Sequence, residues 1–209
     1  MRHGESAANV FDRGGAQPDD GGDRLTEHGW TQARELAERL RGEALETIVA
    51  SPMRRALETA AAIGEALDLP VSTDDELFEV VQSDAYHASR STRGEHAALA
   101  WMPDAPPDES TPGAESFAEI VGRVSRARAR LEAIDAERVL VVRHHDVLHF
   151  LLGLIMFEDD FAPAHLPGLY RLRHANTGVS IFTYDDERVM DGIPMPGWSL
   201  TTWNDRAHL

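Results

Sequence analysis

The sequence predicts an α/β fold, a three-layer α/β/α sandwich with a mainly parallel central sheet. Three short apolar runs, at 45–51, 70–73 and 138–142, have the length and composition of buried strands. Segments whose apolar residues recur every three or four positions separate these runs, which indicates helices alternating with strands. Because a crossover helix returns the chain to the same end of the sheet, this alternation favours parallel strands. The 209 residues suit a single domain.

The elements can be assigned in order along the chain. Residues 11–24 are rich in Gly and Asp and are expected to form a loop. A helix is expected to start after Thr26, a good N-cap residue, and to end at Gly42. The first apolar run follows as a buried strand. Pro52 suits the first position of the next helix, which we expect over 52–69.

In the second half of the chain, predicted strands and helices continue to alternate after a segment of different composition. The second apolar run leads into a stretch at about 80–112 with scattered His, Arg, Trp and Pro, which we expect to be a helical or loop insertion capping a site. Long helices are expected over 115–134 and, after the third apolar run, over 146–156. Residues 178–193 are expected to form a hairpin around Asp185-Asp186.

The composition excludes several classes of function. The chain has no Cys, which excludes thiol nucleophiles, zinc–thiolate sites and iron–sulfur clusters. All 20 basic residues are Arg, so no Lys is present for a Schiff base or a phosphate-binding P-loop. The net charge of −16 argues against a nucleic-acid partner. An anion would have to be bound by Arg, His, backbone N–H groups or a metal.

The sequence also sets expectations for location and partners. No apolar run approaches the roughly 20 residues that span a bilayer, and no signal peptide precedes the first charged residues. We therefore expect a cytoplasmic protein with no membrane partner. The sequence leaves the oligomeric state open, with a homodimer as one possibility.

Polar residues follow each predicted strand. Arg54 and Arg55 come after the first strand, Glu79 after the second, and Arg143 and His144 directly after the third. The carboxyl ends of parallel strands gather at one edge of the sheet, where ligands bind in such folds. Arg binds phosphoryl oxygens in a bidentate manner, and helix N-termini add oriented N–H groups. The pattern therefore indicates phosphoryl chemistry at this edge.

The chain opens on RHGESAAN, which resembles the Arg-His-Gly signature of the histidine phosphatase superfamily, the phosphoglycerate-mutase-like enzymes. Later segments resemble further motifs of that family in the same order. These segments are DRLTEHGWTQA (23–33), SPMRRALETA (51–60), LFE (77–79), VLVVRHHDVLHFLL, NTGVSIF (176–182) and the terminal NDRAHL. Each match alone is weak, but their joint occurrence in order is specific and covers nearly the whole chain.

The resemblance implies roles for five residues that match the family's motifs. His3 would attack phosphorus and become a phosphohistidine. Arg2 and Arg55 would hold the phosphoryl oxygens, while Arg54, next to the second of these, would be a solvated helix residue. His144 would be a second phosphate-holding His. Asn9 would donate a hydrogen bond to the same group. No cofactor or metal is implied.

The resemblance also implies a proton donor, which it places at Glu79. Asp74, Asp75 and Glu76 are close by and stay open as alternatives. The family's usual Gly-x-Trp-Glu-Gly continuation is absent, and the chain reads VVQSDAY instead. Glu58 and Glu115 are expected to be structural helix residues.

The chain departs from the family pattern at His145, where Gly usually follows the second His. His145 either points away from the site or adds a ligand to the substrate or a metal. His145 and His149 have the i, i+4 spacing of a metal-binding pair, which keeps a metal-dependent hydrolase as a minor alternative. Asp146 stands where a zinc protease would have Glu. A packed His149 in a helix is the more ordinary interpretation.

A small phosphorylated molecule is the expected substrate, and phosphomonoester hydrolysis is the favoured reaction. The family's mutases carry a Glu-Arg-His-Tyr-Gly segment at the acid, and this chain lacks it. A phosphoglycerate-mutase-type transfer stays open, as does a non-catalytic module that only binds phosphate ligands. The insertion residues that could touch a leaving group, or simply lie on a solvated helix, are His87, Arg90, Arg93, His96 and Trp101.

One expectation concerns the start of the chain. In the family, Arg-His-Gly ends a central strand, which needs about five or six residues before the Arg. Here only Met1 precedes Arg2. We expect the strands at 46–50 and 138–142 to flank this slot. Since a row of unpaired backbone groups is costly, we predict that a short apolar segment precedes Met1 in the natural protein, so that Met1 is an internal residue. The alternative is that another segment, such as one from a neighbouring molecule, fills the slot.

Overall fold

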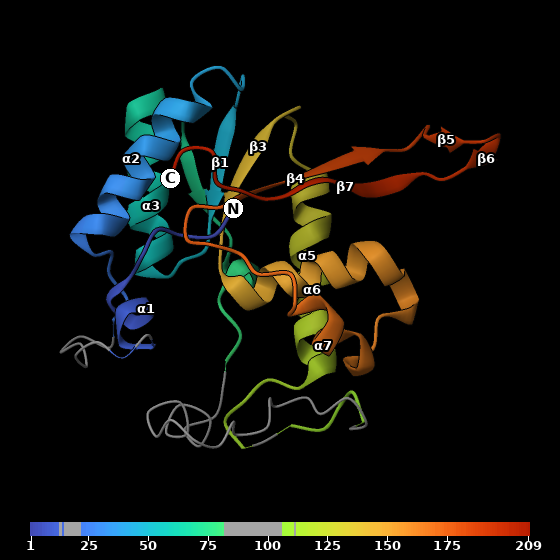
Figure 1. Cartoon of the computed structure of the whole chain (residues 1–209). Coiled ribbons are helices and arrows are strands. Elements are labelled where there is room, and N and C mark those ends of the chain that lie inside the picture. Colours follow the sequence, from blue (N-terminus) through green and yellow to red (C-terminus); the bar gives the residue numbers. More distant parts are fainter. Residues whose placement is uncertain (13, 15–21, 82–105, 111) are drawn as a thin grey trace.

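The computed structural model describes residues 1–12, 14, 22–81, 106–110 and 112–209 (Figure 1). Its helices are α1 (Ala7–Asp12), α2 (Glu27–Leu40), α3 (Arg54–Leu67), α5 (Phe117–Glu132), α6 (His145–Phe157) and α7 (Leu166–Leu169), with a short 3-10 helix η1 (Asp75–Leu77). Its strands are β1 (Thr47–Ala50), β2 (Val71–Thr73), β3 (Val139–Val142), β4 (Val179–Asp185), β5 (Val189–Met190), β6 (Ile193–Pro194) and β7 (Gly197–Asp205). The predicted α/β class is confirmed.

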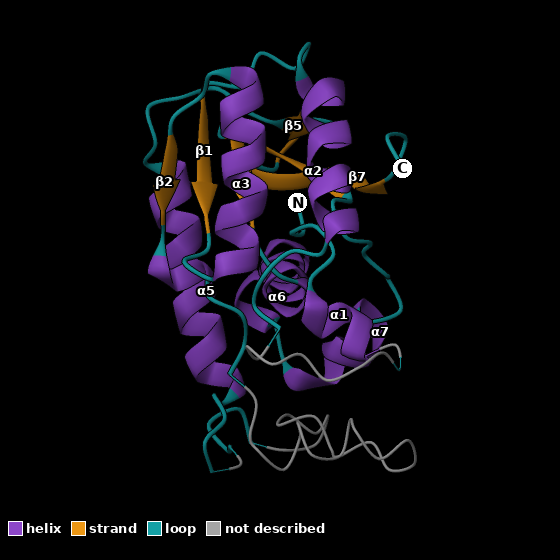
Figure 2. Ribbon diagram, turned by 90° about the vertical axis from the view of Figure 1, so that its left-hand side faces the viewer, coloured by secondary structure: helices purple, strands orange, loops and turns teal. Residues whose placement is uncertain are grey.

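The three apolar runs form one parallel sheet in the order β2-β1-β3. In its register, Ile48 of β1 is paired with Val71 on one side and with Leu140 on the other. Because the strands are parallel, their carboxyl ends meet at one edge. Figure 2 shows the arrowheads of β1 and β2 pointing toward the half of the molecule where α1 lies. This edge is where the predicted site residues were expected.

The first residues of the chain lie along the other side of β3. Arg2 forms a parallel bridge with Arg143, and the His3 N–H donates to the Arg143 carbonyl at 3.0 Å. On the far side, the Thr177 N–H donates to the Arg2 carbonyl at 3.1 Å. The expectation that β1 and β3 flank this segment is wrong, because those two strands pair directly. The segment instead connects β3 with the start of β4.

α2 and α3 cover one face of the sheet (Figure 1). The strand residues that point to this face alternate with residues that point away, as the two-residue period of a strand requires. The buried cluster on this face includes Leu36, Ile48, Ala50, Ile63, Leu140 and Val142. The Thr26 hydroxyl accepts the Gly29 N–H at 3.0 Å, which confirms the predicted N-cap of α2.

α5 covers the opposite face and completes the three layers (Figure 1). The intervening strand residues pack here, in a cluster with Val49, Ala127, Leu131, Val139 and Val141. α5 begins with a capping box between Ser116 and Glu119. A separate core lies between α5, α6 and α7 and is rich in aromatic side chains, among them Phe117, Phe150 and Phe161.

The C-terminal strands form a ribbon that extends from the body of the molecule (Figure 1). β4 pairs with β7 in an antiparallel manner, and the short strands β5 and β6 pair beyond them. The prediction of a hairpin turn at Asp185-Asp186 is wrong, because the chain reverses direction at Asp191-Gly192. Both of these residues have positive φ, 51° and 83°, which is typical of the tight hairpin turn that favours Asp-Gly.

Two further boundaries differ from the expectation, and one segment lies outside the description. α3 begins at Arg54, with Met53 as its N-cap, rather than at Pro52. The expected loop at 11–24 begins inside α1. Most of the insertion at 80–112 lies outside the described residues, including His87, Arg90, Arg93, His96 and Trp101. None of the described helices is long and apolar enough to cross a membrane.

Candidate active site

His3 lies at the carboxyl edge of the sheet, and its neighbours fix one tautomer of its ring. Nδ1 is 2.7 Å from the carbonyl oxygen of Gly4, which can only accept, so Nδ1 carries the proton. Nε2 is 3.1 Å from Nε of Arg55, which can only donate, so Nε2 presents a lone pair. The residue is 2 % exposed. The neutral ring therefore turns its nucleophilic nitrogen toward Arg55.

The surroundings of His3 also oppose its protonation. Burial lowers the pKa of His3 well below its usual range, and the nearby His144, Arg55 and Arg2 lower it further, against the opposite effect of the hydrogen bond to Gly4. A neutral imidazole is the nucleophilic form of this side chain. His3 is therefore ready to react at neutral pH without having to lose a proton.

His144 lies beside His3, as the sequence predicted. It is fully buried at the N-cap of α6, and the two ring centroids are 5.1 Å apart. Its Nε2 is 2.7 Å from the Ser51 hydroxyl, and its buried Nδ1 has no hydrogen-bond partner among the described residues. Burial, followed by Arg55 and Arg2, lowers the pKa of His144 well below its usual range. The unpaired Nδ1 leaves this ring able to bind a ligand.

Arg55 is held between two partners in the first turn of α3. Its Nη1 donates to the Asp23 carboxylate at 2.7 Å, while its Nε points at His3. The Arg55 side chain is 11 % exposed, whereas the Asp23 side chain is 37 % exposed, so only the arginine end of this ion pair is shielded from water. Arg54 lies on the solvated side, 61 % exposed and paired with Glu58 at 2.7 Å, as expected for a residue outside the site.

Arg2 and Asn9 are brought to the same edge. Nη1 of Arg2 donates to the His174 carbonyl at 2.9 Å, which supports the guanidinium from the strand side. Oδ1 of Asn9 accepts from the Ser6 N–H at 3.2 Å and from the Asn176 amide at 2.9 Å. Because the oxygen of Asn9 is engaged within the protein, the group it can offer to an anion is its amide N–H.

Arg143 follows β3 but does not share the environment of Arg2 and Arg55. It is 4 % exposed, and its guanidinium carbon lies 5.8 Å from the centre of the Phe182 ring. Burial lowers the pKa of Arg143 to about 9, against the opposite effect of Glu79. Arg143 is thus a buried charge behind the site, packed against the C-terminal ribbon.

Glu79 is half-buried in the loop after η1. Its carboxylate accepts the Val80 N–H at 3.0 Å. Burial and then the Asp146 carboxylate raise the pKa of Glu79 to about 7, although the Val80 hydrogen bond, Arg55 and Arg2 act in the opposite direction. The interaction with both arginines places Glu79 on the side of His3. A carboxyl group that titrates near neutral pH can serve as both acid and base.

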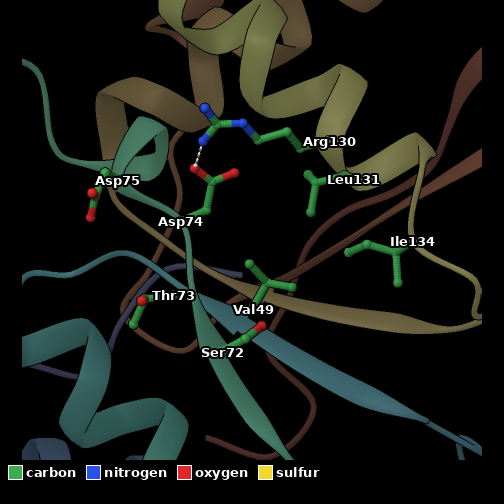
Figure 3. Close-up of a pocket in the computed structure, with 8 residues that line it drawn as sticks. All are labelled: Val49, Ser72, Thr73, Asp74, Asp75, Arg130, Leu131 and Ile134. Atoms are coloured by element: carbon green, nitrogen blue, oxygen red, sulfur yellow. Dashed lines mark hydrogen bonds and ion pairs between the residues drawn. The ribbon is translucent and has the colours of Figure 1, made fainter.

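The three neighbouring carboxylates have other partners or positions. Asp74 is buried and pairs with Arg130 at 2.7 Å, as Figure 3 shows. Glu76 pairs with Arg126 at 3.0 Å, and the hydrogen bond from that arginine lowers the pKa of Glu76. Asp75 is exposed in η1. Glu79 thus combines a raised pKa with electrostatic interactions with Arg55 and Arg2.

The pocket drawn in Figure 3 lies apart from this site. It has a volume of about 320 Å³ on the α5 face of the sheet. Its lining residues are Val49, Ser72, Thr73, Asp74, Asp75, Arg130, Leu131 and Ile134, and none of them is a predicted phosphate ligand. In this pocket Asp74 points toward α5, where it meets Arg130, whereas Asp75 points away from that arginine (Figure 3).

The His145 and His149 rings pack against each other, with centroids 4.4 Å apart, and against Tyr170. Both ring nitrogens of His149 face backbone carbonyl oxygens, those of His145 and Leu172, at 2.8 and 2.9 Å. Nitrogens that face acceptors cannot point lone pairs at a metal in this conformation. The geometry therefore favours a packed His149 over the metal-binding alternative.

Several residues that support the site were given no role by the sequence argument. Thr59 accepts the Gly4 N–H at 3.0 Å, and the Gln32 side chain accepts the Glu5 N–H at 2.9 Å. The Thr26 hydroxyl donates to the Glu5 carboxylate at 2.8 Å. Like Asp23, Ser51 and Asn176, these residues lie inside the quoted motifs. Their position in a motif was the one feature of the sequence that could have indicated a role in the site. Much of each motif thus anchors the loop that carries His3.

Comparisons with known proteins agree with this geometry. The family model described as "Histidine phosphatase superfamily (branch 1)" matches residues 1–191. A protein named "Probable phosphoglycerate mutase GpmB" from Proteus mirabilis is 30 % identical over 216 residues, covering 100 % of this chain and 93 % of the relative. The "Uncharacterized phosphatase PhoE" of Bacillus subtilis is 28 % identical, covering 100 % and 94 %.

Solved structures give the same result. A mycobacterial glucosyl-3-phosphoglycerate phosphatase superposes with a TM-score of 0.73 at 27 % identity, covering 98 % of this chain and 96 % of that one. The relatives thus include both phosphatases and mutase-like proteins. Since the family model matches more than nine tenths of the chain and the site residues lie together at one sheet edge, the chain belongs to the histidine phosphatase superfamily.

Proposed function

We propose that this protein is a phosphatase that hydrolyses small phosphomonoesters through a phosphohistidine at His3. The observation that carries the proposal is the tautomer of His3, whose Nε2 lone pair is turned toward Arg55 in a setting that keeps the ring neutral. A nucleophilic nitrogen beside a guanidinium suits a phosphoryl group, because attack and charge stabilisation then occur at the same phosphorus.

In the first step, Nε2 of His3 forms a bond to phosphorus while the bond from phosphorus to the ester oxygen breaks. Arg2 and Arg55 neutralise the charge on the transferring group. The leaving oxygen takes the proton of Glu79 and departs as an alcohol. Because the pKa of Glu79 is about 7, about half of the molecules hold this proton at neutral pH.

In the second step, the Glu79 carboxylate accepts a proton from water as the water oxygen attacks phosphorus. The bond between phosphorus and Nε2 of His3 breaks, and inorganic phosphate leaves. The step restores a neutral His3 and a protonated Glu79, so the cycle can repeat. A pKa near 7 serves both steps, since one residue must give a proton to the leaving alcohol and then take another from water.

Arg55 has to change one partner during this cycle. Without substrate, its Nε donates to the lone pair of His3 that attacks phosphorus. When the bond to phosphorus forms, this N–H can donate to a phosphoryl oxygen instead. Asp23 holds the other end of the guanidinium at 2.7 Å, so the change requires only a small rotation of the side chain.

A phosphoglycerate-mutase-type transfer is the second candidate. The observation in its favour is the 30 % identity to the Proteus mirabilis protein named as a probable phosphoglycerate mutase. Both reactions share the phosphohistidine and differ in what removes the phosphoryl group, water or the product. The absence of the Glu-Arg-His-Tyr-Gly segment favours water.

The test is to screen the purified protein against a panel of phosphomonoesters and to trap the intermediate with radioactive phosphate. We expect a label that is stable in base and labile in acid, on the N-terminal peptide, and none in His3→Ala. Label retained in His3→Ala would overturn the assignment. Free phosphate released from phosphoglycerate supports the phosphatase, whereas isomerised phosphoglycerate supports the mutase. Phosphate binding without turnover supports the non-catalytic module.

A further inference from the structure

The loop that carries Glu79 is held by an interlocked pair of side chains, Arg123 of α5 and Glu115, which lies just before that helix rather than within it as expected. Arg123 donates through Nη1 to the Glu76 carbonyl at 2.8 Å and to the Phe78 carbonyl at 2.7 Å. These carbonyls belong to the residues just before Glu79. The Arg123 side chain is 11 % exposed, although Phe78 itself is 39 % exposed.

Glu115 holds the same loop on the other side of Glu79. One carboxylate oxygen accepts the Val81 N–H at 2.9 Å, and the Glu115 backbone N–H donates to the Val81 carbonyl at 3.0 Å. The carboxylate also forms a two-point ion pair with Arg123, at 2.7 and 2.8 Å. Backbone groups on both sides of Glu79 are thus tied to one rigid ion pair.

This pair has features that a solvated surface ion pair lacks. The Glu115 side chain is 19 % exposed, and the fork-shaped contact with Arg123 restricts the guanidinium to one plane. Arg126, one turn further along α5, provides the contrast. It is 60 % exposed, and although it also makes a two-point contact, that contact is with the side chain of Glu76 rather than with backbone carbonyls. Arg123 therefore acts on the backbone position of the loop, whereas Arg126 acts on a neighbouring side chain.

We propose that Arg123 and Glu115 are positioning residues for the acid–base step, and that they set where Glu79 presents its proton. This inference rests on the proposed function, because it assumes that Glu79 is the proton donor. A donor has to lie within hydrogen-bond reach of the leaving oxygen, and displacement by about 1 Å can cost on the order of 100-fold in rate. Four hydrogen bonds to the loop backbone oppose such a displacement.

The test compares Arg123→Gln with Arg126→Gln on two substrates that differ in their need for an acid. An alkyl phosphate needs protonation of its leaving oxygen, whereas p-nitrophenyl phosphate hardly does. We expect Arg123→Gln to lower kcat on the alkyl phosphate at least about tenfold more than on the aryl phosphate. Arg126→Gln, the matched control on the same helix, should lower both rates equally or not at all.

A double-mutant cycle with Glu79→Gln separates positioning from a general structural role. If Arg123 acts through Glu79, the leaving-group-dependent loss should disappear when Arg123→Gln is placed in the Glu79→Gln background. A loss of the same size in both backgrounds would overturn the proposal. An equal loss of kcat on both substrates in the Arg123→Gln single variant would also overturn the proposal. Rescue of the alkyl phosphate rate by Arg123→Lys would also count against it, because Lys lacks the fork.

Two further measurements keep the test decisive. If Arg123→Gln does not fold, Glu115→Gln replaces it in the test. This change removes the negative charge of the ion pair and keeps an acceptor for the Val81 N–H. We expect the same dependence of kcat on the leaving group. Failure of the proposed function is distinguishable, because it would appear as unchanged activity in His3→Ala. Activity that depends on His3 and Glu79 but ignores Arg123 and Glu115 would overturn this inference alone.

Discussion

In the proposed reaction, His3 and Glu79 need opposite protonation states at the same pH, and burial favours both. Burial disfavours the charged form of any side chain, so it lowers the pKa of His3 and raises that of Glu79. The nearby charges then act differently on the two residues. Arg2 and Arg55 reinforce the neutral state of His3, while Asp146 opposes the effect of the two arginines on Glu79. A neutral nucleophile and a protonated acid can therefore coexist.

The titration of Glu79 leads to a prediction for the pH profile. The first step needs a protonated Glu79, so kcat/KM on an alkyl phosphate should fall as the pH rises above about 7. Asp146→Asn removes a negative charge that raises this pKa, so the falling limb should move to lower pH. The exposed Asp159→Asn serves as the control and should leave the limb in place. A limb unmoved by Asp146→Asn would contradict the predicted coupling.

The same raised pKa predicts a cost in stability. Glu79 binds its proton more tightly in the folded state, so the free energy of unfolding should fall as the pH rises from about 4.5 to about 7. At pH 8, Glu79→Gln should be more stable than the parent by on the order of 1–3 kcal/mol, measured by urea unfolding. The advantage should shrink at pH 4, where the parent carboxyl is protonated.

Glu76→Gln is the control, for which we expect a change of opposite sign in the free energy of unfolding. Its pKa is lowered by Arg126, so its ion pair stabilises the protein above the unfolded pKa and the stabilisation is lost as the pH falls. The substitution should therefore reduce stability at pH 8 and have little effect at low pH. Equal behaviour of the two variants at pH 8 would contradict the assignment of opposite environments.

At the scale of elements, the start of α2 serves the loop that carries His3. A Cβ at Gly29 would lie 2.1 Å from the Glu5 carbonyl oxygen, and one at Gly4 would lie 2.7 Å from the Gly29 carbonyl oxygen. Only glycine allows the helix and the loop to approach this closely. The glycines of both motifs therefore serve packing between backbones.

Gly29→Ala should separate α2 from this loop. We expect a loss of about 1–3 kcal/mol in the free energy of unfolding, as for other overpacked sites, and a fall in kcat, because the loop positions His3. Gly42→Ala is the matched control, since a Cβ there meets nothing within 4 Å. Urea unfolding and turnover of both variants provide the measurement. A stable, fully active Gly29→Ala would contradict the packing argument.

At the scale of the whole molecule, the charge is distributed unevenly. The net charge is −16, yet the positively charged Arg2 and Arg55 lie beside the two buried histidines, and after burial these charges contribute to the lowered pKa of His144. A buried cluster of guanidinium groups can bind a phosphoryl anion by hydrogen bonds and charge together. An anion site can thus exist in an acidic protein.

This arrangement predicts that activity does not depend on a metal. The proposed site holds its anion with arginines and histidines, and both nitrogens of His149 face carbonyl oxygens. Incubation with a chelator, followed by dialysis, should therefore leave kcat/KM unchanged. A loss of activity that is restored by a divalent metal would contradict this expectation and favour the His145/His149 alternative.

The sequence was sufficient for the features that depend on local pattern and chain order. Apolar runs separated by amphipathic segments specify a parallel sheet, and a parallel sheet gathers the carboxyl ends of its strands at one edge. This is why Arg55, Glu79 and His144 could be expected near His3 before any coordinates. Local pattern was less informative at turns, since the alternation after residue 178 did not reveal that β4 pairs with β7 and reverses at Asp191-Gly192.

The tertiary structure decided which side chains meet across long stretches of sequence. Arg123 reaches the carbonyl of Phe78 from 45 positions away, and Arg55 meets Asp23 across 32. It also distinguished Glu79 from Glu76, which share a short segment but differ in burial and charged neighbours. Hydrogen bonds and pKa values depend on distances of a few ångströms and on exclusion of water, and these are set only when the helices pack onto the sheet.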